Sequence, residues 1–107
     1  MIPLLEFHKD DGRSPFGEWF EGLDNATALK VNTHLTRMSS GNFGQCKSLG
    51  GGLHECKIDH GPGFRVYFGK QGDKLIILLA GGTKKRQQTD IEKARNYWKV
   101  HKERTKA

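Results

Sequence analysis

Three short runs rich in branched and aromatic residues lie between residues 52 and 90, and turns that contain glycine separate them. Such a pattern is typical of antiparallel strands joined in a meander. We predict strands over residues 53–59, 64–69 and 74–80. The last run is apolar at every position after Lys74, which favours a strand in the middle of a sheet with both faces covered.

Alternation along these strands divides their side chains between two faces. One face carries His54, Cys56, Ile58, Phe64, Val66 and Phe68. The other carries Glu55, Lys57, Arg65 and Tyr67. A slip of one residue would bury Arg65 in the apolar face, so the register is strongly determined. We expect the apolar face to pack against helices and the polar face to be an uncovered surface.

The segments before the meander predict one strand and two helices. Residues 2–7 read as a short strand, with Pro3 near its start. Ser14 and Pro15 are typical of a helix start, and aromatic residues follow them at helical spacing. Asp24 is a cap for a second helix over residues 25–39. Two helices joined by so short a link are expected to form a hairpin that packs on the sheet.

Glycine and polar residues dominate residues 39–52, where we expect a loop with little regular structure. Residues 83–88 are expected to form a basic connector. Thr89 and Glu92 then have the spacing of a capping box for a last helix, which carries an apolar stripe. The predicted class is therefore α+β: an N-terminal strand, a helical hairpin, an antiparallel sheet of about four strands and a C-terminal helix.

Length and composition narrow the function classes. A chain of 107 residues corresponds to a single domain, residues 1–107. The net charge of +6 favours an anionic partner, either a nucleic acid or an acidic protein. No apolar run is long enough for a membrane span, and the first residues do not resemble a signal peptide. Cys46 and Cys56 lack the spacing of a zinc site or a disulfide framework. We expect a cytoplasmic protein.

Positively charged residues recur on the meander and directly after it: Lys57, Arg65, Lys84, Lys85 and Arg86. Cations that converge from several elements can bind a phosphodiester and offset the charge that develops during its cleavage. Arg65 is the strongest candidate, because a planar guanidinium suits a phosphate and stays charged. Lys47 is expected to extend this cationic surface.

Other readings of these residues stay open. Arg65 or Lys57 can pair with Glu55 in a purely structural role, and Glu55 is either a general base or the group that orients the cations. Tyr67 either stacks on a base, forms a hydrogen bond or covers the sheet. His54 is either an RNA contact or a core histidine. No carboxylate cluster suits a hydrolytic metal pair, so neither metal nor cofactor is expected. Cleavage without a metal favours RNA, whose 2′-hydroxyl can attack the adjacent phosphorus.

The order of elements, together with GLHECKIDHGPGFRVYF and LLAGGTKKRQQTDIEKA, resembles the RelE/ParE toxin superfamily. The HigB-like, phage-derived branch, often called addiction-module killer proteins, is the most similar. The resemblance implies a toxin of a type II toxin–antitoxin pair, with a helix-turn-helix antitoxin as its partner. RelE-like and HigB-like members cut mRNA, usually on the ribosome and without a metal.

Carried onto this chain, the resemblance places Lys57, Arg65 and either Lys85 or Lys84 at the positions of the phosphate chemistry. RelE-like members often have a tyrosine at the start of the last helix, where this chain has Ile91. The resemblance therefore leaves the proton-transfer group open. ParE-like members share the fold but inhibit DNA gyrase, so a toxin without nuclease activity is the alternative.

Overall fold

Residues 1–106 of the computed structural model are described, and their strands form one mixed sheet in the order β1-β5-β4-β3-β2. The strands are β1 (Leu4–Glu6), β2 (Cys46–Gly50), β3 (Leu53–Ile58), β4 (Phe64–Gln71) and β5 (Leu75–Thr83). The helices are α1 (Pro15–Glu21), α2 (Asn25–Ser39), the 3-10 turn η1 (Lys84–Arg86) and α3 (Gln87–Arg104). β1 runs parallel to β5, and the other neighbours pair antiparallel. The predicted α+β class is confirmed.

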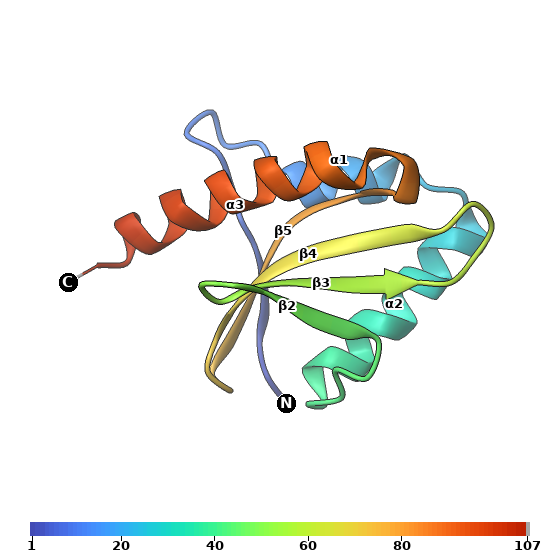
Figure 1. Cartoon of the computed structure of the whole chain (residues 1–107), viewed down its shortest axis with the longest axis horizontal. Coiled ribbons are helices and arrows are strands. Elements are labelled where there is room, and N and C mark those ends of the chain that lie inside the picture. Colours follow the sequence, from blue (N-terminus) through green and yellow to red (C-terminus); the bar gives the residue numbers. More distant parts are fainter. Residues whose placement is uncertain (107) are drawn as a thin grey trace.

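Helices cover both faces of the sheet. In Figure 1, α2 lies behind the strands, and α3 runs along the upper side of the sheet with α1 behind it. Phe16 of α1 and Val31 of α2 belong to one core cluster, together with Ile58 and Val66 of the strands. Trp98 of α3 belongs to a second cluster with strand residues of the opposite orientation. We call these two sides of the sheet the α2 face and the α3 face.

The position predicted for the apolar strand is confirmed, because β5 lies between β1 and β4. Its side chains alternate between the two clusters. Ile76 and Leu78 pack in the cluster of the α2 face, whereas Ile77 and Leu79 pack in that of the α3 face. Burial on both faces explains why this strand has no polar alternation.

Local capping sets the starts of the first two helices, as predicted. The Ser14 hydroxyl accepts a hydrogen bond from the Gly17 amide at 2.9 Å. The Asp24 carboxylate accepts one from the Thr27 amide, also at 2.9 Å. Each cap satisfies an amide that has no partner within its helix, and Pro15 fits the first turn because it has no amide hydrogen to satisfy.

The prediction of a loop over residues 39–52 is wrong, and the sheet therefore has five strands instead of about four. β2 pairs antiparallel with β3, with Lys47 opposite Glu55. Gly51 and Gly52 form the turn between the two strands, and both have positive φ, as does Gly50 at the end of β2. The strand escapes prediction because its five residues lack a run of branched or aromatic side chains.

The predicted capping box at Thr89 is also wrong, as is the separate connector before it. β5 continues to Thr83, η1 follows at once, and α3 begins at Gln87. Thr89 therefore lies inside the first turn of an existing helix, and its side chain does not cap that helix. The chain passes directly from the 3-10 turn into α3, so the helix start needs no separate signal at Thr89.

The expectation of an uncovered polar face is wrong as well. The apolar stripe of α3, with Ala94 and Trp98 buried, packs against Leu53 and Tyr67 on that face. Gly69 makes this approach possible, because a Cβ at Gly69 would overlap the Trp98 ring. No helix within residues 1–106 has the length and apolar character that crossing a membrane requires.

Candidate functional site

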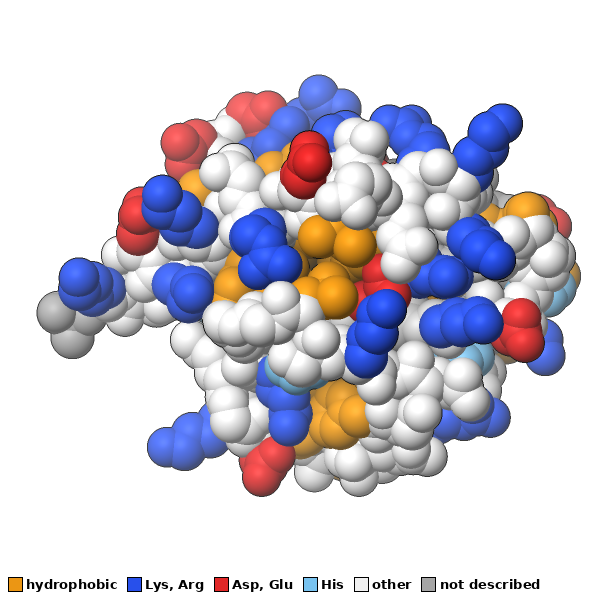
Figure 2. All heavy atoms as spheres, viewed as in Figure 1, with side chains coloured by type: hydrophobic (Ala, Val, Ile, Leu, Met, Phe, Trp, Pro, Cys, Tyr) orange, Lys and Arg blue, Asp and Glu red, His pale blue; other side chains and the backbone are white. Residues whose placement is uncertain are grey.

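Side chains of three neighbouring strands meet on the α3 face. Lys47 of β2, Glu55 of β3 and Tyr67 of β4 stand opposite one another in register. In the next row, Lys57 of β3 stands opposite Arg65 of β4. Figure 2 shows Lys and Arg side chains gathered over the right-hand part of this view, with acidic side chains among them. The strand register therefore brings together the cations that the sequence places on different strands.

Glu55 is the centre of this group. Its Oε1 atom lies 3.7 Å from Lys47 Nζ and 3.7 Å from Arg65 Nε, and its Oε2 atom accepts a hydrogen bond of 2.8 Å from Gln87 Nε2. Its side chain is 4% exposed and that of Arg65 is 8% exposed, whereas Lys47 is 66% exposed. The pairing of Arg65 with Glu55 is thus a buried ion pair, as one of the sequence interpretations has it.

Arg65 nevertheless retains unused hydrogen-bonding capacity. Its Nε atom has no hydrogen-bond partner in the described part of the chain, because 3.7 Å to Glu55 is too long for a hydrogen bond. Nη1 makes a contact of 3.4 Å with the carbonyl of Phe64. A buried guanidinium with so few acceptors is unusual, and it is the kind of group that an anionic oxygen can satisfy.

A surface hollow of about 370 Å³ lies over this group. It is lined by Lys47, Glu55, Lys57 and Arg65, together with Gly44, Gln45 and Cys46. Lys47 and Lys57 are exposed, whereas Arg65 and Glu55 are buried. Three cations face one carboxylate in the hollow, so its local charge is positive. Such a hollow can hold an anionic group in contact with the buried Arg65 and the exposed Lys47 and Lys57 at once.

Lys84, Lys85 and Arg86 form the exposed turn η1 at the end of β5. The Lys84 amide donates a 3.1 Å hydrogen bond to the Gly63 carbonyl, which places the turn beside the start of β4. The turn lies at the same end of the sheet as Lys57 and Arg65, because Arg65 stands opposite Gly82 of β5. The structure thus places these three cations near the hollow without making them part of its lining.

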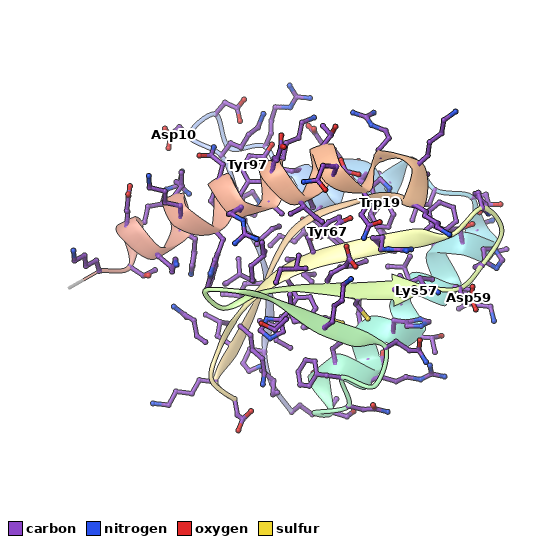
Figure 3. All side chains as sticks on the ribbon, viewed as in Figure 1. Asp10, Trp19, Lys57, Asp59, Tyr67 and Tyr97 are labelled. Carbon is purple, nitrogen blue, oxygen red and sulfur yellow. The ribbon has the colours of Figure 1, made fainter. Side chains whose placement is uncertain are left out.

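Tyr67 is fully buried, so the predicted stacking of Tyr67 on an RNA base is wrong. Figure 3 shows Tyr67 between α3 and the strands, with Lys57 near the far end of β3. Burial raises the pKa of Tyr67, and the nearby carboxylates of Glu55 and Asp90 raise it further. Within residues 1–106 its hydroxyl has no hydrogen-bond partner. Tyr67 therefore packs beneath the charged group, and α3 and the sheet shield it from any RNA bound at the surface.

His54 is not part of this group, because it points to the α2 face. Its ring stacks on Phe68 at 5.3 Å between centroids, and Nδ1 lies 3.1 Å from the Gly52 carbonyl. His54 is therefore not brought together with Lys57 and Arg65, and an RNA contact by His54 stays a prediction. The alternative, a histidine packed on the core, agrees with its position, since the even-numbered residues of β3 face α2.

Two residues of the region are missing from the sequence prediction. Gln87 holds Glu55 from the start of α3, and its position after the basic turn gives no signal of that role. Asp90 is buried on the same side of the sheet, and a Cβ at Gly82 would overlap its carboxylate. The Gly81-Gly82 pair is the signal that could have shown this close approach, because glycine within a strand often marks one. Among residues 1–106, no three His, Cys, Asp or Glu side chains gather as they would around a metal ion.

No family model matches the chain. An uncharacterized protein from Haemophilus influenzae is 43% identical to it over 81 residues. The matched residues cover 75% of this chain and 82% of the relative.

Proposed function

The chain belongs to one family with the uncharacterized Haemophilus influenzae protein, and we propose that it is a toxin of a type II toxin–antitoxin pair that binds and cleaves mRNA. The observation that carries this proposal is the convergence of Lys47, Lys57 and Arg65 on one hollow beside the carboxylate of Glu55. The resemblance to RelE-like and HigB-like toxins supports the choice of mRNA on the ribosome as the substrate.

The proposed chemistry uses the 2′-hydroxyl of RNA as the nucleophile. An RNA phosphate binds in the hollow, where Lys47 and Lys57 contact its oxygens from the exposed rim. The 2′-hydroxyl gives up its proton, its oxygen attacks phosphorus to form a 2′,3′-cyclic phosphate, and the bond to the 5′-oxygen breaks as that oxygen takes a proton from solvent. Arg65 stabilises the negative charge that develops on the phosphate, because its guanidinium is already held in place before the reaction. Glu55 either accepts the hydroxyl proton or orients Arg65.

Arg65→Ala tests the proposal directly. Loss of one contact to the developing charge is expected to lower the cleavage rate by about 10²–10³-fold and to abolish growth arrest. Primer extension on cellular mRNA after induction measures cleavage as discrete new 5′ ends. Circular dichroism and a thermal melt establish that the variant is folded, which is essential because Arg65 is buried.

Lys57→Ala provides the same test without disturbing a buried group. Lys57 is exposed, so its truncation is expected to leave stability within about 0.5 kcal/mol of the wild type and to weaken cleavage. Lys30→Ala, an equal change on α2, is the matched control and should cleave normally. Full toxicity in folded Arg65→Ala and Lys57→Ala proteins would refute the proposed site.

A ParE-like toxin that inhibits DNA gyrase is the second candidate. The buried pairing of Arg65 with Glu55 favours it, because this pair explains both residues without any substrate. This candidate predicts DNA damage signalling with intact mRNA after induction, whereas the nuclease predicts new mRNA ends. Either toxin requires a neighbouring antitoxin gene, and co-expression of the adjacent reading frame should then restore growth.

A further inference from the structure

Cys46 and Cys56 stand directly opposite each other on β2 and β3. The Lys57 amide donates a 3.0 Å hydrogen bond to the Gln45 carbonyl, so the ladder bond lies one row away from the cysteines. The Cys46 amide instead donates to the Phe43 carbonyl at 2.9 Å. The two cysteines are therefore a non-hydrogen-bonded pair, in which Cα atoms lie about 4.5 Å apart. That separation falls within the range of about 4.4–6.8 Å found in disulfides.

The surroundings of the two sulfur atoms favour reaction between them. A hollow of about 270 Å³ on the α2 face is lined by both cysteines and by His34 and Arg37. The neighbouring Cys56 sulfur and burial both raise the pKa of the Cys46 thiol. The neighbouring Cys46 thiol lowers the pKa of Cys56, burial opposes that shift, and Arg37 adds to it. Of the two thiols, Cys56 is therefore the one that loses its proton more readily.

We propose that Cys46 and Cys56 form a redox-sensitive modification site that closes to a cross-strand disulfide when it reacts with hydrogen peroxide. Both thiols are free in this structure. The inference rests on strand register and on the shared hollow, so it stands independently of the proposed nuclease activity.

The reaction proceeds in two steps. The Cys56 thiolate, whose proton has passed to solvent, bonds to one peroxide oxygen, and the O–O bond breaks to release hydroxide. Cys46 gives its proton to that hydroxide, and its sulfur then attacks the Cys56 sulfur. The S–O bond breaks, and the departing hydroxide takes a proton from solvent. Two thiols are oxidised, and one peroxide is reduced to two water molecules.

The bridge would join β2 to β3 beside Lys47 and Glu55, the next residues along each strand. These two side chains point to the α3 face, whereas the cysteines point to the α2 face. A disulfide would therefore tie the edge strand β2 to its neighbour on the α2 face, next to the hollow around Arg65 that Cys46 also borders. Its direct effect is on the mobility of β2.

Peroxide treatment of the folded protein tests the inference. Alkylation of the remaining thiols, intact mass and peptide mapping then show which sulfur atoms have reacted. We expect both thiols to disappear together, the mass to fall by two hydrogen atoms, and one intramolecular link between residues 46 and 56 to appear in a reducible form. Independent oxidation of single thiols to sulfinic acid, cross-linked dimers, or unreacted thiols would each overturn the inference.

Two comparisons separate this site from chance oxidation. In Cys46→Ser, which alters the more exposed cysteine, Cys56 should accumulate as a sulfenic acid that a dione probe captures. In urea, the wild-type chain should close its disulfide at least about tenfold more slowly, because the strands no longer align the thiols. Equal rates in the folded and unfolded chains, or no probe adduct in Cys46→Ser, would count against the site.

Discussion

The carboxylate of Asp90 is buried, and one of its oxygens has no hydrogen-bond partner in the described chain. That oxygen, Oδ2, lies against Gly82. Burial raises the pKa of Asp90, while Arg86 and Lys93 lower it in part. The charged carboxylate is therefore less favourable in the folded protein than in water, because lost hydration is not replaced by direct contacts.

Asp90→Asn is expected to make the protein more stable than the wild type at neutral pH. The folded protein holds the Asp90 proton more tightly than the unfolded chain does, since the pKa of an aspartate in an unfolded chain is near 3.8. The contribution of Asp90 to wild-type stability is therefore fully present below that pH and is lost as pH rises through the raised folded pKa, whereas the variant lacks this decline. Urea unfolding from acidic to neutral pH measures the difference, with exposed Asp59→Asn as the control. If the gain in unfolding free energy of Asp90→Asn over the wild type does not increase with pH, this explanation is wrong.

Alternation in the sequence predicts that Glu55, Lys57, Arg65 and Tyr67 share one face, and the strand register agrees. It does not predict that Arg65 and Tyr67 are buried. Their cover depends on α3, which follows far along the chain, and the alternation within β3 and β4 contains no information on where that helix packs. The residue types of the candidate site were therefore predictable, while their exposure was not.

The contact between α3 and the sheet depends on the absence of a side chain at Gly69. The Trp98 ring lies over this glycine, and its Nε1 atom donates a 2.7 Å hydrogen bond to the Gly51 carbonyl. Trp98 thus fixes the helix to β4 and to the turn between β2 and β3. A bulky helix residue needs a small strand residue beneath it to pack at normal density.

Gly69→Ala is expected to destabilise the protein by about 1–3 kcal/mol, because the new Cβ displaces a buried ring. Gly69 does not have a positive φ, so the cost arises from overlap and not from backbone strain. Gly22→Ala is the matched control, since the nearest atom to its Cβ would lie at an ordinary 3.6 Å. Equilibrium urea unfolding compares the two variants. Equal stability in both would show that α3 can shift freely on the sheet.

Elements with local signals were predictable. Ser14 and Asp24 cap their helices as expected, since a cap depends on residues three positions apart. β2 is an element of another kind, because it is a strand only through its pairing with β3. The apolar residues of β5 did contain a signal for α3: side chains buried on both faces require cover on both faces.

At the scale of the whole molecule, the net charge of +6 means that the proposed RNA binding should depend on salt. The exposed cations of η1 lie at the same end of the sheet as the hollow, so they are placed to contact phosphates that flank the one proposed to bind there. Release of counterions from such contacts makes the affinity fall as the salt concentration rises.

The double variant Lys84→Ala, Lys85→Ala is expected to bind single-stranded RNA more weakly and with a smaller salt dependence. Each lost phosphate contact lowers the slope of log K against log salt by about 0.7. Fluorescence anisotropy with a labelled oligonucleotide measures this slope. Lys30→Ala, on the opposite side of the sheet, should leave the slope unchanged. If the η1 double variant and Lys30→Ala alter the slope equally, the RNA responds to the overall charge of the protein and not to a defined binding path that includes η1.

Because Ile76 and Leu78 of β5 belong to one hydrophobic cluster and Ile77 and Leu79 belong to the other, the two clusters share a strand and neither can unfold alone. Detachment of α3 would expose Ile77 and Leu79 to solvent, while the other face of the same strand still packs against α1 and α2. The protein should therefore unfold in one cooperative transition. Its two tryptophans, Trp19 on the α2 face and Trp98 on the α3 face, should show fluorescence changes with the same midpoint.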